Sequence, residues 1–314
     1  MSTLRVNYIT NKFGDQGPVI AGITTISSDS HMVFPSGDTR MRNSELVTSG
    51  LTYHCDASIP TSYSGTGTIV NNLGSAGSSY KGYWFGSDTT GTKSAAMFDP
   101  NEGGGSWFLE GMGGDFHRIN YLMISATANA VPGSLMGDSN GSSLGFTNSF
   151  TQSWWSKCLR LGGQNRVQPI LTLNNHTQSS HGGDKSGINM SIGTDGAIDF
   201  QTRLNATCCQ TLEGKPGAVT SRWQNTTITY DGAVKKMYLD GNLIGQAANT
   251  GTMVMKQSVY FGANSDNVAA DPNQASIYAF RGYLAKIMMY SRAITQDEVY
   301  RLYASQKYRF PDQA

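Results

Sequence analysis

The chain has 314 residues, of which 38% are hydrophobic and 14% charged, and its 23 basic and 22 acidic side chains leave a net charge of +1. This balance gives no electrostatic reason to expect nucleic acid or an anionic membrane as a partner. The 37 glycines and the 10% of aromatic residues favour a β-rich protein with tight turns over a helical bundle. No apolar run is long enough to predict a membrane-spanning helix.

Residues 1–45 contain two short β-prone runs, LRVNYI and IAGITTI, which the turn cluster FGDQGPV separates. Two isolated strands cannot bury enough surface to fold alone. The segment therefore either stays flexible or docks on another surface, and we expect docking, as an arm for anchoring and multimerisation. The apolar positions of this arm are Leu4, Val6, Tyr8, Ile20, Ile23 and Ile26.

Residues 46–314 alternate short apolar or aromatic runs with clusters of Gly, Asn, Asp and Ser, a spacing typical of an all-β sandwich or barrel. The clearest stretch is TITYDGAVKKMYLDGNLIG, residues 227–245. It contains two Asp–Gly pairs, at 231–232 and 240–241, and this dipeptide is a strong hairpin signal. We therefore predict three successive antiparallel strands in this stretch.

One convincing helix closes the domain at about residues 295–307. Thr295 is a candidate N-cap and Glu298 lies three residues later, the pattern of a capping box. Val299, Leu302 and Tyr303 fall on one face of the predicted helix. A single short helix after an all-β domain is expected to cover a sheet.

The order of several motifs resembles the concanavalin A-like jelly roll in its laminin-G-like form. These motifs are GLTYHCDASIPTSYSG, SAAMFDPNEGGGSWFLEG, FTQSWWSKCLR, WQNTTITYDGAVKKMYLDGNLIGQ and the closing FRGYLAKIMMYSRAITQDEVYRLYASQ. The resemblance covers about 250 of the 314 residues. It implies a jelly-roll sandwich that occupies residues 46–314, behind the arm of residues 1–45.

The arm carries a separate resemblance. Its LRVNYI strand, Gly–Pro turn, IAGITTIS run and Phe–Pro–Ser–Gly exit resemble the leader of appendage proteins from tailed phages, particularly those of marine cyanobacteria. In such proteins the leader is expected to attach and multimerise a C-terminal lectin-like module.

The carboxylates do not have the pattern of a glycosidase. A glucanase of this fold would carry paired carboxylates with E-x-D-x-x-E spacing, and this motif does not occur. Calcium binding would need Asp, Glu and carbonyl oxygens that converge from loops. The alternative is that each aspartate only sets an Asx-turn, and no cofactor is predicted. The weak calcium candidates are Asp56, Asp99, Asp266 and Asp271.

Sugar binding would use an exposed aromatic ring with polar side chains around it. Trp154 and Trp155 are adjacent on a strand and face opposite sides. Trp107 follows a Gly-rich turn and is the best candidate for an exposed ring, although core packing is the commoner role of any tryptophan. Two long polar loops, residues 174–187 and 263–276, add further candidates. The glycan candidates are Trp107, His176, His181, Asp184, Asn264 and Asp266.

Together these features predict a non-enzymatic phage virion protein, either a tail fibre or a head fibre or decoration, assembled in the host cytoplasm. The expected partners are further copies of the chain (a trimer, by analogy with phage fibres), other virion proteins and a host-surface glycan. No nucleic acid and no membrane insertion are expected. A free-standing carbohydrate-binding module is the alternative, and a glycoside hydrolase of the same fold is the third hypothesis.

Overall fold

The computed structural model describes residues 47–86, 96–109, 120–126, 149–159, 168–174, 187–204, 207–250, 259–263 and 280–310. The chain divides into two units, Met1–Met41 and Arg42–Ala314. The predicted arm, with its apolar positions from Leu4 to Ile26, lies outside the described residues, so its anchoring role stays a prediction. Among the described helices, none is long and apolar enough to cross a membrane.

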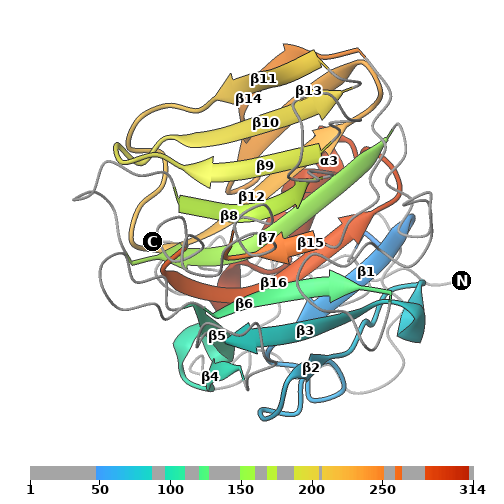
Figure 1. Cartoon of the computed structure of the whole chain (residues 1–314), viewed down its shortest axis with the longest axis vertical. Coiled ribbons are helices and arrows are strands. Elements are labelled where there is room, and N and C mark those ends of the chain that lie inside the picture. The colour runs from blue at the N-terminus through green and yellow to red at the C-terminus, as the bar shows by residue number, and fades with distance from the viewer. Residues whose placement is uncertain are drawn as a thin grey trace, which may run out of the picture. The chain divides into compact units, whose positions relative to one another are not determined.

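Two antiparallel sheets form the body of the second unit (Figure 1). The first sheet has the order β14–β13–β12–β7–β16–β5–β4, and β1 pairs with β16 beside this path. Its strands are β1 (Leu51–Asp56), β4 (Met97–Asp99), β5 (Ser106–Leu109), β7 (Phe150–Cys158), β12 (Trp223–Tyr230), β13 (Val234–Leu239), β14 (Asn242–Ala248) and β16 (Gly282–Tyr290).

The second sheet has the order β11–β10–β9–β8–β15–β6–β3–β2. Strands far apart in the sequence are therefore neighbours, as when β15 pairs with both β6 and β8. Its strands are β2 (Ile69–Val70), β3 (Lys81–Gly86), β6 (Asn120–Ser125), β8 (Gln168–Asn174), β9 (Gly187–Ile192), β10 (Ile198–Leu204), β11 (Thr207–Glu213) and β15 (Val259–Phe261). The predicted all-β sandwich is confirmed.

The main core lies between the sheets, where alternate side chains of each strand point inward. Trp107 belongs to this core and is 0% exposed, with its ring centroid 5.8 Å from that of Trp84 and 5.7 Å from that of Tyr63. The expectation that Trp107 is exposed is wrong. The Gly-rich turn before it ends at Gly105, and alternation along β5 then turns Trp107 into the sandwich beside Leu109.

The predicted three-stranded meander is confirmed as β12, β13 and β14. Both residues of the second hairpin turn have positive φ, 51° at Asp240 and 77° at Gly241, as a type I′ turn requires. At the first turn, the Asp231 Oδ1 atom accepts hydrogen bonds from the backbone N–H groups of Ala233 and Val234. The Asp–Gly pairs therefore set both turns.

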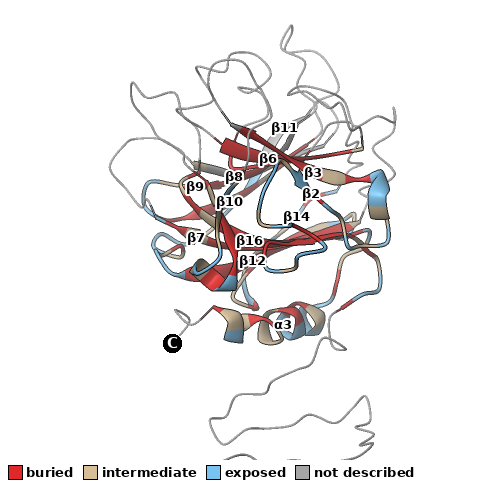
Figure 2. Ribbon diagram, turned by 90° about the horizontal axis from the view of Figure 1, so that it is seen from below, coloured by how far each residue is buried: buried red, intermediate tan, exposed pale blue. Residues whose placement is uncertain are grey.

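The closing helix is α3 (Gln296–Ala304), which ends before the predicted limit and is followed by the short 3-10 helix η5 (Lys307–Arg309). Thr295 and Glu298 form the predicted capping box, and Val299 and Leu302 are buried. Figure 2 shows α3 against the outer face of the first sheet, below β12 and β16. Two further 3-10 helices are η2 (Gly77–Ser79) and η3 (Glu102–Gly104).

Candidate functional site

The outer face of the first sheet is closed by the end of the chain. The ring of Phe310 stacks on Trp155 with centroids 4.2 Å apart and lies 4.8 Å from Trp223. Both indole N–H groups are bonded, that of Trp155 to Gln306 Oε1 at 2.9 Å and that of Trp223 to Glu102 Oε1 at 2.6 Å. Trp154 and Trp155 do face opposite sides of β7, as predicted, but the outer ring is buried as well.

Asp56 lies on the same face and forms ion pairs with two cationic side chains of the chain. Its carboxylate lies 2.6 Å from Arg309 Nη1 and 3.7 Å from Lys286 Nζ. Burial alone would raise the pKa of Asp56, but the charges of Arg309 and Lys286 outweigh it and lower the pKa. Asp56 is therefore a structural ion-pair residue in this chain, which corrects its weak candidacy as a calcium ligand.

Asp99 forms an Asx-turn, which is the alternative to a role as a calcium ligand. Its Oδ1 atom accepts hydrogen bonds from the backbone N–H groups of Asn101 and Glu102, at 2.9 and 3.3 Å. Within the described ranges, no group of three His, Cys, Asp or Glu side chains has the arrangement of a metal site. The other calcium candidates, Asp266 and Asp271, lie outside the described residues.

One row of paired positions crosses the outer face of the second sheet, and its side chains change from apolar to polar along the row. Strand pairing places its positions next to one another from β2 to β11. The first positions are apolar or aromatic and the last are amides and hydroxyls. In order they are Ile69, Tyr83, Met123, Tyr260, Thr172, Asn189, Gln201 and Thr211.

The aromatic half of this face forms a cluster separate from the core. Phe85 and Tyr121 are stacked with centroids 5.4 Å apart, and Tyr121 lies 6.0 Å from Tyr260. The hydroxyl of Tyr121 is buried and has no hydrogen-bond partner among the described residues, and burial raises its pKa. The cluster is buried, with Tyr121 3% and Tyr260 1% exposed, and the Tyr53 hydroxyl of the main core is likewise without a partner among the described residues.

The polar half of the face is accessible. Asn189 and Gln201 are half-buried, Thr211 is exposed, and the Gln201 Nε2 atom lies 3.4 Å from Thr211 Oγ1. The Oδ1 atom of Asn189 is buried without a partner among the described residues. Beside this row, Asp199 and Glu213 are directly opposite each other on β10 and β11, and burial followed by the charge of Glu213 raises the pKa of Asp199.

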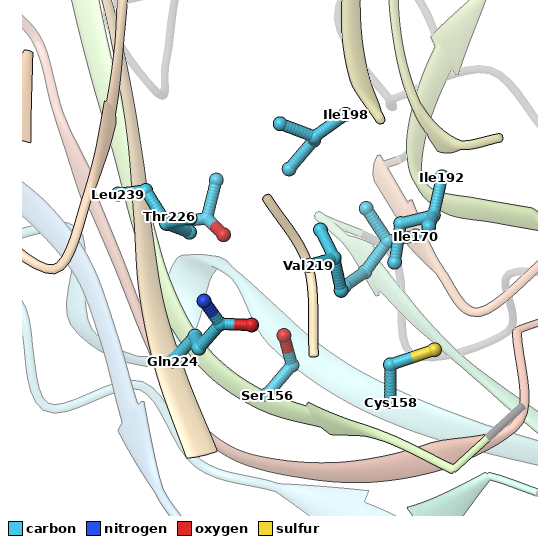
Figure 3. A pocket seen from close by; sticks show the side chains of 9 residues that line it. All are labelled: Ser156, Cys158, Ile170, Ile192, Ile198, Val219, Gln224, Thr226 and Leu239. Carbon is cyan, nitrogen blue, oxygen red and sulfur yellow. The ribbon is translucent and has the colours of Figure 1, made fainter. Parts of the chain in front are cut away.

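A small cavity lies between the two sheets (Figure 3). It has room for about one water molecule, so it does not hold a sugar. Polar side chains, Cys158 and Leu239 of the first sheet, isoleucines of the second sheet and Val219 from the segment between β11 and β12 line it. They are Ser156, Cys158, Ile170, Ile192, Ile198, Val219, Gln224, Thr226 and Leu239.

The other glycan candidates from the sequence lie outside the described residues. They are His176, His181, Asp184, Asn264 and Asp266. So does GDSNG at 137–141, which has the G-x-S-x-G spacing of a nucleophile elbow. That motif acts at a strand-to-helix turn of an α/β sheet, which is not the fold of this chain. The row with Asn189 and Gln201 was missed because only strand pairing brings its members together.

Similar solved structures share the fold at low sequence identity. The binding domain of botulinum neurotoxin DC, in complex with SialylT, has a TM-score of 0.54 and 12% identity over 82% of this chain and 52% of its own. A structure of botulinum neurotoxin type C, whose cell entry depends on two ganglioside molecules, has a TM-score of 0.53 and 12% identity over 82% and 52%. The binding domain of Paraclostridial Mosquitocidal Protein 1 has a TM-score of 0.53 and 13% identity over 81% and 52%.

This chain therefore spans about half the length of these structures. No curated protein matches the sequence. The family model of the concanavalin A-like lectin/glucanases superfamily, in its Laminin_G_3 form, matches residues 125–300, which is more than half of the chain. The chain belongs to the concanavalin A-like lectin/glucanases superfamily.

Proposed function

We propose that this chain is a non-enzymatic recognition protein that binds a glycan on the outer face of its second sheet. The observation that carries the proposal is the polar end of the row, where Asn189 and Gln201 are half-buried and Thr211 is exposed. The hydroxyls of a sugar exchange hydrogen bonds with side chains of this kind, because amides and hydroxyls both donate and accept. The Gln201 amide and the Thr211 hydroxyl, which are not fully buried, are the groups that would exchange hydrogen bonds with the sugar.

The similar structures support a binding role in general terms. The botulinum and mosquitocidal structures that share the fold are binding domains. Their TM-scores, 0.54 and 0.53, show the shared fold, and their identity to this chain, 12 to 13%, leaves the ligand to be determined by experiment.

A glycan array with the purified full chain tests this proposal. We expect binding of at least one glycan, and a loss of about tenfold or more in affinity for the double variant Asn189→Ala/Gln201→Ala, because each lost hydrogen bond to a sugar is worth about 1 kcal/mol. Gln296→Ala is the matched control, since Gln296 is an exposed amide on α3, on the other side of the sandwich. A folded chain that binds no glycan, or a double variant that binds like the wild type, would contradict the proposal.

The same samples test the hydrolase alternative. Release of sugar from a bound polysaccharide would overturn the non-enzymatic part of the proposal. Asp199 and Glu213 would then be the residues to change, because directly opposite positions on paired strands bring two carboxyl groups close together, as a retaining glycosidase requires.

The sequence of residues 1–45 favours a phage virion as the place where this protein works. We propose that the arm anchors the sandwich on the particle, as part of a tail fibre or of a head fibre or decoration, and that it multimerises the chain as a trimer. The support is the resemblance of LRVNYI, IAGITTIS and the Phe–Pro–Ser–Gly exit to appendage leaders. Host-surface glycans are then the natural ligands of the second sheet.

Deletion of residues 1–45 tests the anchoring role. We expect the truncated chain to be absent from purified virions, because the remaining sandwich has lost its attachment. Truncated protein at wild-type level on the particles would contradict anchoring. A chain that is absent from virions but binds glycans in solution would favour the free-standing carbohydrate-binding module.

A further inference from the structure

The two ends of the sandwich differ in how their edge strands are built. At one end the edge strands are β2, with two residues, and β4, with three. At the other end they are β11 and β14, with seven residues each. Very short edge strands are a common protection against pairing with other chains, whereas long ones present a row of free backbone groups. Only the second end is therefore built to accept a further strand.

The outer edges of β11 and β14 are open in the described part of the chain. β14 pairs with β13 alone and β11 with β10 alone. The two edges also lie beside each other, because a Cβ atom built on Gly245 of β14 would lie 3.2 Å from Leu212 Cδ1 of β11. Figure 1 shows both strands at the same end of the molecule. One partner surface could therefore meet both sheets at once.

These edges also lack the charged residues that usually prevent association. β14 has the sequence NLIGQAA, without a charged residue, and Glu213 at the end of β11 is the single charge of the two strands. Lys235, on the neighbouring β13, is buried and donates inward to backbone carbonyls. A register shift between Met237 and Tyr238 distorts the first part of the β13–β14 ladder, so residues 245–248 form the regular part of the edge.

We propose that a second copy of this chain pairs with this end of the sandwich, with residues 245–248 of the two copies antiparallel about a twofold axis. An uncharged strand can face an identical strand without repulsion, and a twofold axis pairs each edge with its own copy. The small side chains of Ala247 and Ala248 let the two strands approach. The partner is therefore another copy of the chain, and the contact is separate from any contact that the arm makes.

The test compares the mass of the full-length wild type with that of the double variant Gln246→Lys/Ala248→Lys by light scattering at micromolar concentration. Both positions are exposed, so the lysines do not disturb the fold. They place like charges across the proposed axis, which opposes pairing. We expect the wild type to contain an even number of chains, which is six where the arm also forms a trimer, and the variant to have half that mass. Amide hydrogen exchange at residues 245–248 should be slower in the concentrated wild type than in the dilute one.

Met97→Lys is the matched control, because Met97 is 46% exposed on β4, at the short-edged end of the sandwich. This variant should keep the mass of the wild type. A monomeric or odd-numbered wild type would overturn the proposal, and so would a Gln246→Lys/Ala248→Lys variant that keeps the wild-type mass. Loss of assembly in the Met97→Lys variant alone would overturn it too, because the interface would then lie at the other end.

Discussion

The outer faces of the two sheets use similar residues in opposite ways. On the first sheet, Asn225 donates to Ser153 Oγ and to the Trp154 carbonyl and accepts from Thr227 Oγ1. On the second sheet, the Asn189 Oδ1 and Tyr121 hydroxyl atoms are buried without partners among the described residues. The first face is covered by α3 and Phe310, although the Nε2 atom of His54 on this face is also buried without a partner among the described residues. The two faces thus differ in what lies on them: α3 and Phe310 pack on the first, and the second has the half-buried Gln201 and the exposed Thr211.

The largest effect on stability is expected for the ion pairs of Asp56 on the first face. Asp56→Ala leaves Arg309 and Lys286 without their counter-ion in a buried place. Removal of one partner from such a cluster should lower the free energy of unfolding by about 4 kcal/mol. Urea unfolding of the full chain measures this. Asp297→Ala is the control, an exposed acid in the first turn of α3 whose loss should cost less than about 1 kcal/mol. Equal losses in the two variants would show that the cluster is not what closes this face.

The second effect concerns the aromatic part of the same closure. Phe310 is 0% exposed between Trp155 and Trp223, and Phe310→Ala should lower the free energy of unfolding by about 3 kcal/mol. Tryptophan fluorescence should also shift to the red as water reaches the two indole rings. Tyr308→Ala removes a ring that is 56% exposed and should change stability by less than about 0.5 kcal/mol. An unchanged spectrum in the Phe310→Ala variant would mean that the end of the chain does not cover this face.

The third effect is a dependence on pH that belongs to the first face. Burial, followed by the positive charge of Lys286, lowers the pKa of His54 to about 4. The unfolded chain binds this proton near pH 6.5, so stability should fall as the pH drops from about 6.5 to about 4. Asp56 is the acid beside His54, and because its own pKa is lowered, its contribution is lost only at still lower pH.

The variant His54→Gln removes this titration. The loss of stability between about pH 6.5 and 4 should then disappear, whereas the loss at lower pH should remain. Glu298 contributes to this loss of stability at low pH, because its hydrogen bonds with the Arg292 guanidinium lower its pKa to about 2. An unchanged slope in the His54→Gln variant would assign the titration to another group.

Local sequence patterns predicted much of the fold. The capping box at Thr295 and the Asp–Gly turns at Asp231 and Asp240 are set by neighbours in the chain, and the structure confirms them. The exposure of Trp107 was predicted wrongly because it depends on which way alternation turns the ring after the Gly-rich turn. The row that contains Asn189 was not predicted at all, because it joins positions from eight strands. Local signals carry no information about such pairings.

The smallest effect on stability is expected for the amides of the second face, and it separates the two faces most directly. Asn189→Ala removes a carbonyl oxygen that is buried without a partner among the described residues. The gain from removing this unpaired oxygen offsets the packing that is lost with the side chain. The free energy of unfolding should therefore change by less than about 0.5 kcal/mol. Asn225→Ala, the matched amide on the first face, should cost about 2 kcal/mol, because it breaks three buried hydrogen bonds. Urea unfolding of both variants, beside the glycan array, measures the difference. If Asn189→Ala costs as much as Asn225→Ala, the second face also serves stability, and its unused polar atoms must find partners elsewhere in the folded chain.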